Sequence, residues 1–125
     1  LNLSNPKMMD IAVPTNKSMG LKIDLQKQLN GIDYKDLIKM CSIDNTLLID
    51  LREKSEIEKK PSLKNSTNIP YSSFQQYFKD NAKKLVNKKI VFYCAVGERS
   101  SLAVQICQSL KFQNVCHLVG GINNI

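Results

Sequence analysis

The stretch YCAVGERSS, residues 93–101, places a thiol between an apolar run and a run of small and polar residues. Residues 90–92, Ile-Val-Phe, are typical of a buried strand, and the serines that follow commonly begin a helix. In open parallel sheets, ligands bind at the carboxyl ends of strands, where the next helix presents unpaired N–H groups and a partial positive charge. We therefore predict that Cys94 is a thiolate nucleophile, held in a loop that favours anions.

A cysteine in an apolar pattern is more often a small core residue than a nucleophile. We assign that structural role to the other three cysteines, which are Cys41, Cys107 and Cys116. Cys94 differs because it follows a strand, because Gly97 can take a conformation closed to other residues, and because Ser100 can begin a helix.

The rest of the chain must position this loop. Three short apolar runs predict strands, over residues 46–51, 88–93 and 114–119. Helical spacing predicts helices over residues 34–41, capped by Asp33, over 72–85, capped by Ser72 or Ser73, and over 101–110. We expect a helical turn at 52–58 and a polar loop at 59–68. This alternation predicts an α/β domain with a mainly parallel central sheet.

Composition excludes several classes of protein. The chain has 125 residues, 42% hydrophobic and 23% charged, which fits one soluble globular domain. It lacks both an apolar run of the roughly 20 residues that a membrane helix needs and the layout of a signal peptide, so we expect a cytoplasmic protein that binds no membrane. Four cysteines without a CxxC pair argue against a disulfide framework or a zinc knuckle, and a single histidine argues against a metal site.

The formal net charge of +7 raises the possibility of nucleic-acid binding. Because the lysines are scattered and few aromatic residues lie among them, we expect no nucleic-acid partner. The charge favours small anionic substrates.

CAVGERSS resembles the active-site segment of the rhodanese family. The resemblance continues in the apolar spacing of the next helix and in GGI at 120–122. Upstream, LIDLRE at 48–53 is similar to that family's LIDVRE, and NIP at 68–70 to its NIP. Together these motifs cover residues 31–125 and imply a rhodanese-like α/β domain with helices on both faces of its sheet.

The resemblance implies a sulfurtransferase. Cys94 would take a sulfane sulfur from thiosulfate or glutathione persulfide, hold it as a persulfide, and pass it to a thiol such as glutathione. The substrate-binding loop would comprise Ala95, Val96, Gly97, Glu98, Arg99 and Ser100, with its N–H groups stabilising the persulfide anion. Arg99 would either hold an anionic donor or pair structurally, whereas Glu98 would face solvent. Asp50 and Arg52 would support the neighbouring loops by hydrogen bonds and an ion pair.

Two other functions stay open. Thiol phosphatases of related fold carry an arginine six positions after the cysteine, but here that position is Ser100 and Arg99 comes one residue early. A non-catalytic rhodanese-like interaction module is the other alternative, although such modules commonly lose the cysteine. The apolar Ala95 and Val96 suggest that an organic persulfide is preferred over thiosulfate.

Residues 1–20 resemble the C-terminal end of metallo-β-lactamase-fold persulfide dioxygenases, in an extended arm followed by a linker at 21–30. This resemblance implies a longer protein in which such a domain, with its iron, is fused ahead of residue 1, while the present chain needs no cofactor.

The loop 59–70 lacks the glycines and histidine usual in the rhodanese family, so we expect it to be mobile. Ile125 stands where the family has a tryptophan, so we expect the domain to lack its last helix.

Overall fold

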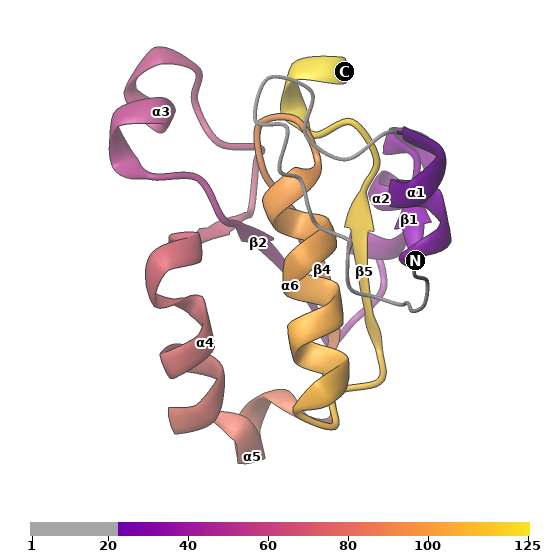
Figure 1. Ribbon diagram of the computed structural model, residues 1–125, viewed down its shortest axis with the longest axis vertical. Helices are drawn as coiled ribbons and strands as arrows, with labels where there is room; N and C mark the ends of the chain where they lie inside the picture. The colour runs from indigo at the N-terminus through magenta and orange to yellow at the C-terminus, as the bar shows by residue number, and fades with distance from the viewer. Residues whose placement is uncertain (1–22) are drawn as a thin grey trace, which may run out of the picture.

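The computed structural model describes residues 23–125 and contains a sheet of five strands (Figure 1). The strands are β1 (Gly31–Ile32), β2 (Thr46–Asp50), β3 (Thr67–Asn68), β4 (Lys89–Tyr93) and β5 (Val115–Leu118). Their order across the sheet is β1-β5-β4-β2-β3, and each neighbouring pair is parallel. The predicted α/β class with a parallel sheet is confirmed.

Helices lie on both faces of this sheet. They are α1 (Ile23–Gln28), α2 (Tyr34–Cys41), α3 (Lys54–Lys59), α4 (Tyr71–Asp80), α5 (Ala82–Leu85) and α6 (Glu98–Ser109), and a 3-10 turn follows at Ile122–Asn124. Figure 1 shows α6 in front of β4, with α4 to its left and β5 to its right. As predicted, Asp33 caps α2, because its side chain accepts a hydrogen bond from the N–H of Asp36 at 2.8 Å.

Aromatic rings fill the core between the sheet and helices α4, α5 and α6. The ring of Phe78 is fully buried and lies against those of Phe74, Phe92 and Phe112, with centroids 5.3–5.8 Å apart. A second core on the opposite face holds α2 against the sheet through Leu37, Leu48, Val91, Tyr93, Leu118 and Ile122. Strands β2 and β4 are therefore buried on both faces, which explains their continuous apolar sequences.

Several local predictions differ from the structure. Residues 23–28, predicted to belong to a linker, form helix α1, and its Gln26 is buried. Helix α6 begins at Glu98 rather than at residue 101, because Gly97 already caps it. Helix α4 is capped by Pro70 and not by either serine. Cys41 is exposed, because α2 buries only Leu37.

The loop at 59–70, expected to be mobile, is held by hydrogen bonds. The hydroxyl of Tyr93 accepts from the N–H of Leu63 at 2.8 Å and lies 2.9 Å from the Ser66 hydroxyl. Asn68 donates to the carbonyl oxygens of Asp50 and Arg52. These contacts tie the loop to the ends of strands β2 and β4.

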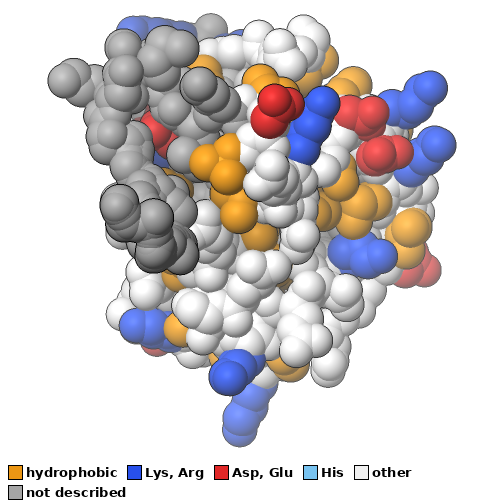
Figure 2. All heavy atoms as spheres, turned by 45° about the vertical axis from the view of Figure 1, so that its right-hand side comes forward, with side chains coloured by type: hydrophobic (Ala, Val, Ile, Leu, Met, Phe, Trp, Pro, Cys, Tyr) orange, Lys and Arg blue, Asp and Glu red, His pale blue; other side chains and the backbone are white. Residues whose placement is uncertain are grey.

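One face of the molecule carries its charges in a dispersed way (Figure 2). On the face in Figure 2, most lysine and arginine side chains of the described residues stand apart from one another, with acidic side chains between some of them. None of the helices within residues 23–125 is long and apolar enough to cross a membrane. The predicted arm at residues 1–20 lies outside the described residues.

Candidate active site

Cys94 is the first residue after strand β4, and its side chain is fully buried. Its sulfur accepts hydrogen bonds from the N–H groups of Gly97 at 3.2 Å and Ser100 at 3.4 Å. The Ser100 hydroxyl lies 3.7 Å from the same sulfur. Donors aimed at one sulfur at the start of a helix stabilise a negative charge on it, so the arrangement suits a thiolate or a persulfide anion.

Gly97 makes this geometry possible. Its φ of +94° lies in the left-handed region, and it is the residue immediately before helix α6. A Cβ at this position would overlap the side-chain amide of Gln26. The loop can therefore fold around the sulfur only with glycine here.

Gln26, on helix α1, braces the loop from the side. Its Nε2 donates to the carbonyl of Val96 at 3.1 Å, and its Oε1 accepts from the N–H of Gly120 at 2.7 Å. One buried side chain thus connects the loop after β4 to the loop after β5.

His117, on strand β5, is fully buried behind the sulfur. Its Nδ1 lies 2.9 Å from the Ser100 hydroxyl, and its Nε2 lies 3.0 Å from the carbonyl oxygen of Gln26. Burial lowers the pKa of His117 below its ordinary value, although hydrogen bonding to the Gln26 carbonyl acts in the opposite direction. The imidazole is therefore neutral at neutral pH.

Arg99 is half-buried and does not point freely into solvent. Its guanidinium binds both carboxylate oxygens of Glu56 on α3, at 2.7 and 2.8 Å. This interaction, opposed by partial burial, lowers the pKa of Glu56 to about 2 and raises that of Arg99. We predicted that Arg99 either holds an anionic donor or forms a structural pair, and the structure contains the pair, with Glu56. Glu98, expected to face solvent, is half-buried at the start of α6.

Asp50 and Arg52 form a buried ion pair at the end of strand β2, with 2.9 Å between the closest nitrogen and oxygen. Arg52 also donates to the Lys60 carbonyl at 2.8 Å, and the Ser62 hydroxyl donates to Asp50 at 2.7 Å. Burial alone would raise the pKa of Asp50, but hydrogen bonds from Arg52 and Ser62 hold it below its ordinary value. The pair therefore fixes the loop after α3 beside the site.

The C-terminal turn is joined to the same loop. The N–H of Ile122 donates to the Cys94 carbonyl at 2.9 Å, and that of Asn123 to the Ala95 carbonyl at 3.0 Å. Ala95 is half-buried, whereas Val96 at the rim is 51% exposed. The rim beside the sulfur is therefore uncharged at these two residues.

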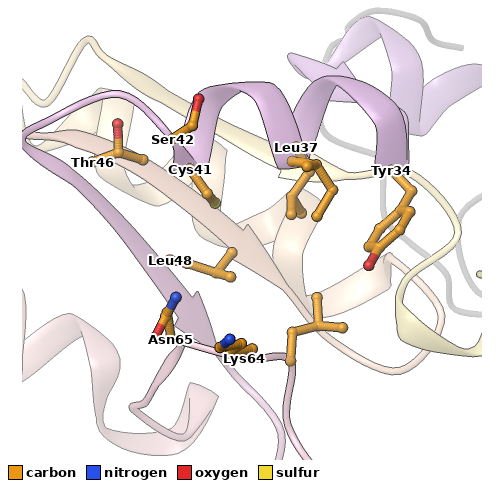
Figure 3. Close-up of a pocket in the computed structure, with 10 residues that line it drawn as sticks. Tyr34, Leu37, Cys41, Ser42, Thr46, Leu48, Lys64 and Asn65 are labelled. Carbon is orange, nitrogen blue, oxygen red and sulfur yellow. The ribbon is translucent and has the colours of Figure 1, made fainter.

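The other cysteines lack such surroundings. Burial raises the pKa of Cys107 to about 12 and that of Cys116 to about 11, so both remain protonated thiols at neutral pH. Cys41 lines a pocket of about 370 Å³ between α2, β2 and the loop at 63–65, shown in Figure 3. Because this pocket lies on the sheet face that α2 covers, it is separate from Cys94. Within residues 23–125 there is no group of three or more side chains suited to hold a metal ion.

Sequence reasoning missed three residues of this neighbourhood: Gln26, Glu56 and His117. His117 carried the one available signal, because a lone histidine inside the apolar run NVCHLV needs buried polar partners. Gln26 and Glu56 stand in polar segments that give no comparable signal.

Comparisons with known proteins agree with this geometry. The model of the rhodanese-like domain family matches residues 33–125. The mouse thiosulfate sulfurtransferase/rhodanese-like domain-containing protein 3 is 28% identical over 101 residues, which are 73% of this chain and 64% of the relative. A tRNA uridine(34) hydroxylase from Rickettsia prowazekii is 31% identical over 105 residues, covering 82% of this chain and 42% of the relative. The chain thus spans less than two thirds of these relatives.

Solved structures show the same fold. A protein of unknown function from Rhodopseudomonas palustris, described as a possible tyrosine phosphatase, superposes with a TM-score of 0.70 at 24% identity, over 90% of this chain and 91% of the other. A rhodanese-related protein from Thermoplasma volcanium superposes with a TM-score of 0.58 at 30% identity, over 76% of this chain and 88% of the other.

Proposed function

Because this chain belongs to the rhodanese-like domain family, we propose that it is a sulfurtransferase that carries sulfane sulfur on Cys94. The donor is thiosulfate or an organic persulfide such as glutathione persulfide. The acceptor is a thiol, such as glutathione, or another thiophilic molecule.

The proposed reaction is a double displacement. The Cys94 thiolate attacks the outer sulfur of the donor, forming a new S–S bond while the donor's own S–S bond breaks. The donor leaves as a thiolate or as sulfite, with the electron pair of the broken bond. An acceptor thiolate then attacks the outer sulfur of the Cys94 persulfide and releases the Cys94 thiolate, so that no external oxidant or reductant is consumed.

The observation that carries this proposal is the pair of main-chain N–H groups, from Gly97 and Ser100, that donate to the sulfur of Cys94. Such donors stabilise negative charge on a sulfur atom without requiring a cationic side chain. The proposal therefore does not depend on Arg99, whose charge is paired with Glu56.

Mass spectrometry of the chain after incubation with donor tests the proposal. We expect about 32 Da to be added on the peptide containing Cys94, the increment of one sulfur atom in the covalent intermediate. The variant Cys94→Ala should lose both the increment and all turnover of thiosulfate with cyanide. Turnover that survives in Cys94→Ala would exclude the covalent route through this residue.

Thiol-dependent phosphatase activity is the second candidate, because the Rhodopseudomonas palustris structure is described as a possible tyrosine phosphatase. In this chain, however, the residue six positions after Cys94 is Ser100. We therefore expect no hydrolysis of an aryl phosphate. Hydrolysis that disappears in Cys94→Ala would instead favour the phosphatase.

The uncharged rim supports an organic persulfide as the preferred donor. Val96 is largely exposed there, and a carbon-containing donor can contact it, whereas thiosulfate gains nothing from an apolar surface. We expect a higher kcat/KM with glutathione persulfide than with thiosulfate. A clear preference for thiosulfate would contradict this assignment.

Residues 1–20 support a further proposal, that the natural protein is a cytoplasmic fusion with an iron-dependent persulfide dioxygenase. In such a fusion the present chain would make or consume the glutathione persulfide that the dioxygenase oxidises. Isolation of the natural protein tests this, since we expect a larger polypeptide with bound iron. The name of the Rickettsia relative concerns tRNA, but we propose only sulfur transfer here.

A further inference from the structure

Three groups form a continuous buried line behind the reactive sulfur. The sulfur of Cys94 lies 3.7 Å from the Ser100 hydroxyl, which in turn lies 2.9 Å from Nδ1 of His117. All three side chains are fully buried. We propose that His117 is a positioning residue for the site and that, acting through Ser100, it accepts the proton that Cys94 releases when the thiolate forms.

The contacts at Nε2 identify the tautomer that this role requires. Nε2 lies 3.0 Å from the carbonyl oxygen of Gln26, which can only accept a hydrogen bond. It also lies 3.3 Å from the hydroxyl oxygen of Ser101, whose own hydrogen is directed at the Gly97 carbonyl. Both neighbours of Nε2 therefore act as acceptors, so Nε2 carries the hydrogen.

With Nε2 protonated, Nδ1 of the neutral ring is an acceptor. The Ser100 hydroxyl has two acceptors within reach, Nδ1 of His117 at 2.9 Å and the Gly97 carbonyl at 3.3 Å. The shorter contact is the one to Nδ1. The oxygen of Ser100 is then free to accept from the thiol, so the donor and acceptor directions run from Cys94 to His117 without a break.

The proton transfer is balanced within these three groups. The S–H hydrogen of Cys94 moves to the oxygen of Ser100 while the hydrogen of Ser100 moves to Nδ1 of His117, and the sulfur keeps the electron pair of the S–H bond. The products are a thiolate and an imidazolium, and Ser100 is unchanged. When Cys94 is regenerated after sulfur transfer, the proton returns along the same path.

Among the described residues, the groups around His117 offer no competing acceptor for this proton. Strands β1 and β4 place Gly31 and Phe92 beside His117, while α1 and α6 contribute Gln26 and the two serines, none of which is charged. Arg99 on α6 interacts electrostatically with Cys94, but a guanidinium cannot accept a proton. Burial lowers the pKa of His117, so the ring is neutral at neutral pH and Nδ1 is open to a proton, while the same burial opposes the imidazolium that forms.

The inference gives the proposed sulfur transfer its nucleophile, and thus rests on that function, but thiolate formation can be measured without any sulfur donor. Iodoacetamide reacts with the thiolate, and peptide mass spectrometry separates Cys94 from the other cysteines. The experiment uses a Cys41→Ser background because Cys41 is exposed. A chain that alkylates as described but transfers no sulfur would refute the function and leave the inference intact.

The decisive variant is His117→Asn, which keeps an acceptor near the position of Nδ1 but cannot take up a proton. We expect alkylation of Cys94 at neutral pH to slow by about a hundredfold or more, the range for loss of a proton acceptor, and the midpoint of the pH profile to move to higher pH. Ser100→Ala should do the same. Ser109→Ala, at an exposed serine of the same helix, is the control and should remain within about twofold of the parent.

A parental rate and pH midpoint in folded His117→Asn would overturn the inference. If that variant does not fold, nuclear magnetic resonance of the parent decides, because the chain contains a single histidine and its imidazole signals need no assignment by mutation. We expect the neutral ring to carry its hydrogen on Nε2. A neutral ring with the hydrogen on Nδ1 could not accept from Ser100, and would also overturn the inference.

Discussion

At the scale of single residues, Gly97 determines whether the loop can surround the sulfur. In Gly97→Ala, the left-handed backbone costs about 1–2 kcal/mol, and the added methyl group also displaces the Gln26 side chain, which is held at both ends. We expect at least this loss in the free energy of unfolding, measured by urea denaturation. Val96→Ala at the exposed neighbouring position should leave the free energy of unfolding within about 0.5 kcal/mol of the parent.

The ion pair between Glu56 and Arg99 joins α3 to the start of α6. Both side chains are about one-third exposed, so solvent screens the interaction. A double-mutant cycle with Glu56→Gln and Arg99→Gln should give a coupling of about 0.5 kcal/mol in the free energy of unfolding. A coupling indistinguishable from zero would mean that the pair only orients α3.

The same pair makes stability depend on pH. The pKa of Glu56 is lowered to about 2 by Arg99, below its value in the unfolded chain. The stabilisation is therefore complete above the unfolded value of 4.5 and is lost as the pH falls through about 2. We expect the stability difference between the parent and Glu56→Gln to shrink over this range. Glu58→Gln, on the same helix but without an ion pair in the described part of the chain, is the control.

At the scale of elements, helix α1 acts as a brace for the site although only one of its residues is buried. Gln26→Ala removes the acceptor for the Gly120 N–H and the donor to the Val96 carbonyl. Unpaired buried polar groups cost about 1–3 kcal/mol, so we expect a loss of that size in unfolding free energy together with reduced sulfur transfer. Gln28→Ala, exposed on the same helix, should change neither measurement.

The elements with continuous or periodic apolar residues could be predicted from sequence. Strands β2, β4 and β5 have apolar runs because both of their faces are covered. The start of helix α2 is indicated by its N-cap, Asp33. Helix α1 could not be predicted, because it buries a glutamine and no apolar stripe. Strands β1 and β3 have two residues each, which is too short for any pattern to show.

The residues of the site also divide into those that the sequence could predict and those that it could not. Cys94, Gly97 and Ser100 are close in sequence, so their spacing already places them in one loop. Gln26 lies 68 positions before Cys94 in the sequence, and His117 lies 23 positions after it. Only the parallel pairing of β1, β5 and β4 brings them together, and pairing partners cannot be read from one sequence.

At the scale of the whole molecule, the aromatic core on the α6 face joins helices α4, α5 and α6 to the sheet. Phe78 is fully buried among Phe74, Phe92 and Phe112. Phe78→Ala should lower the free energy of unfolding by about 3–5 kcal/mol, through lost burial and the cavity left behind. Ile38→Ala, in helix α2, removes a side chain that is 51% exposed and should lower the free energy of unfolding by less than about 1 kcal/mol. A small effect of Phe78→Ala on urea denaturation would show that this core can collapse around the gap.

The two main-chain contacts between the loop and the C-terminal turn give the molecule a built-in reporter. The amides of Ile122 and Asn123 are bonded to the carbonyl groups of Cys94 and Ala95, so their exchange with deuterated solvent depends on how firmly that loop is held. Adding a sulfur atom to Cys94 lengthens the side chain that the loop surrounds and should change the exchange rates at these two positions together. The occupancy of the carrier could then be followed residue by residue in an intact, working protein, with no label near the sulfur.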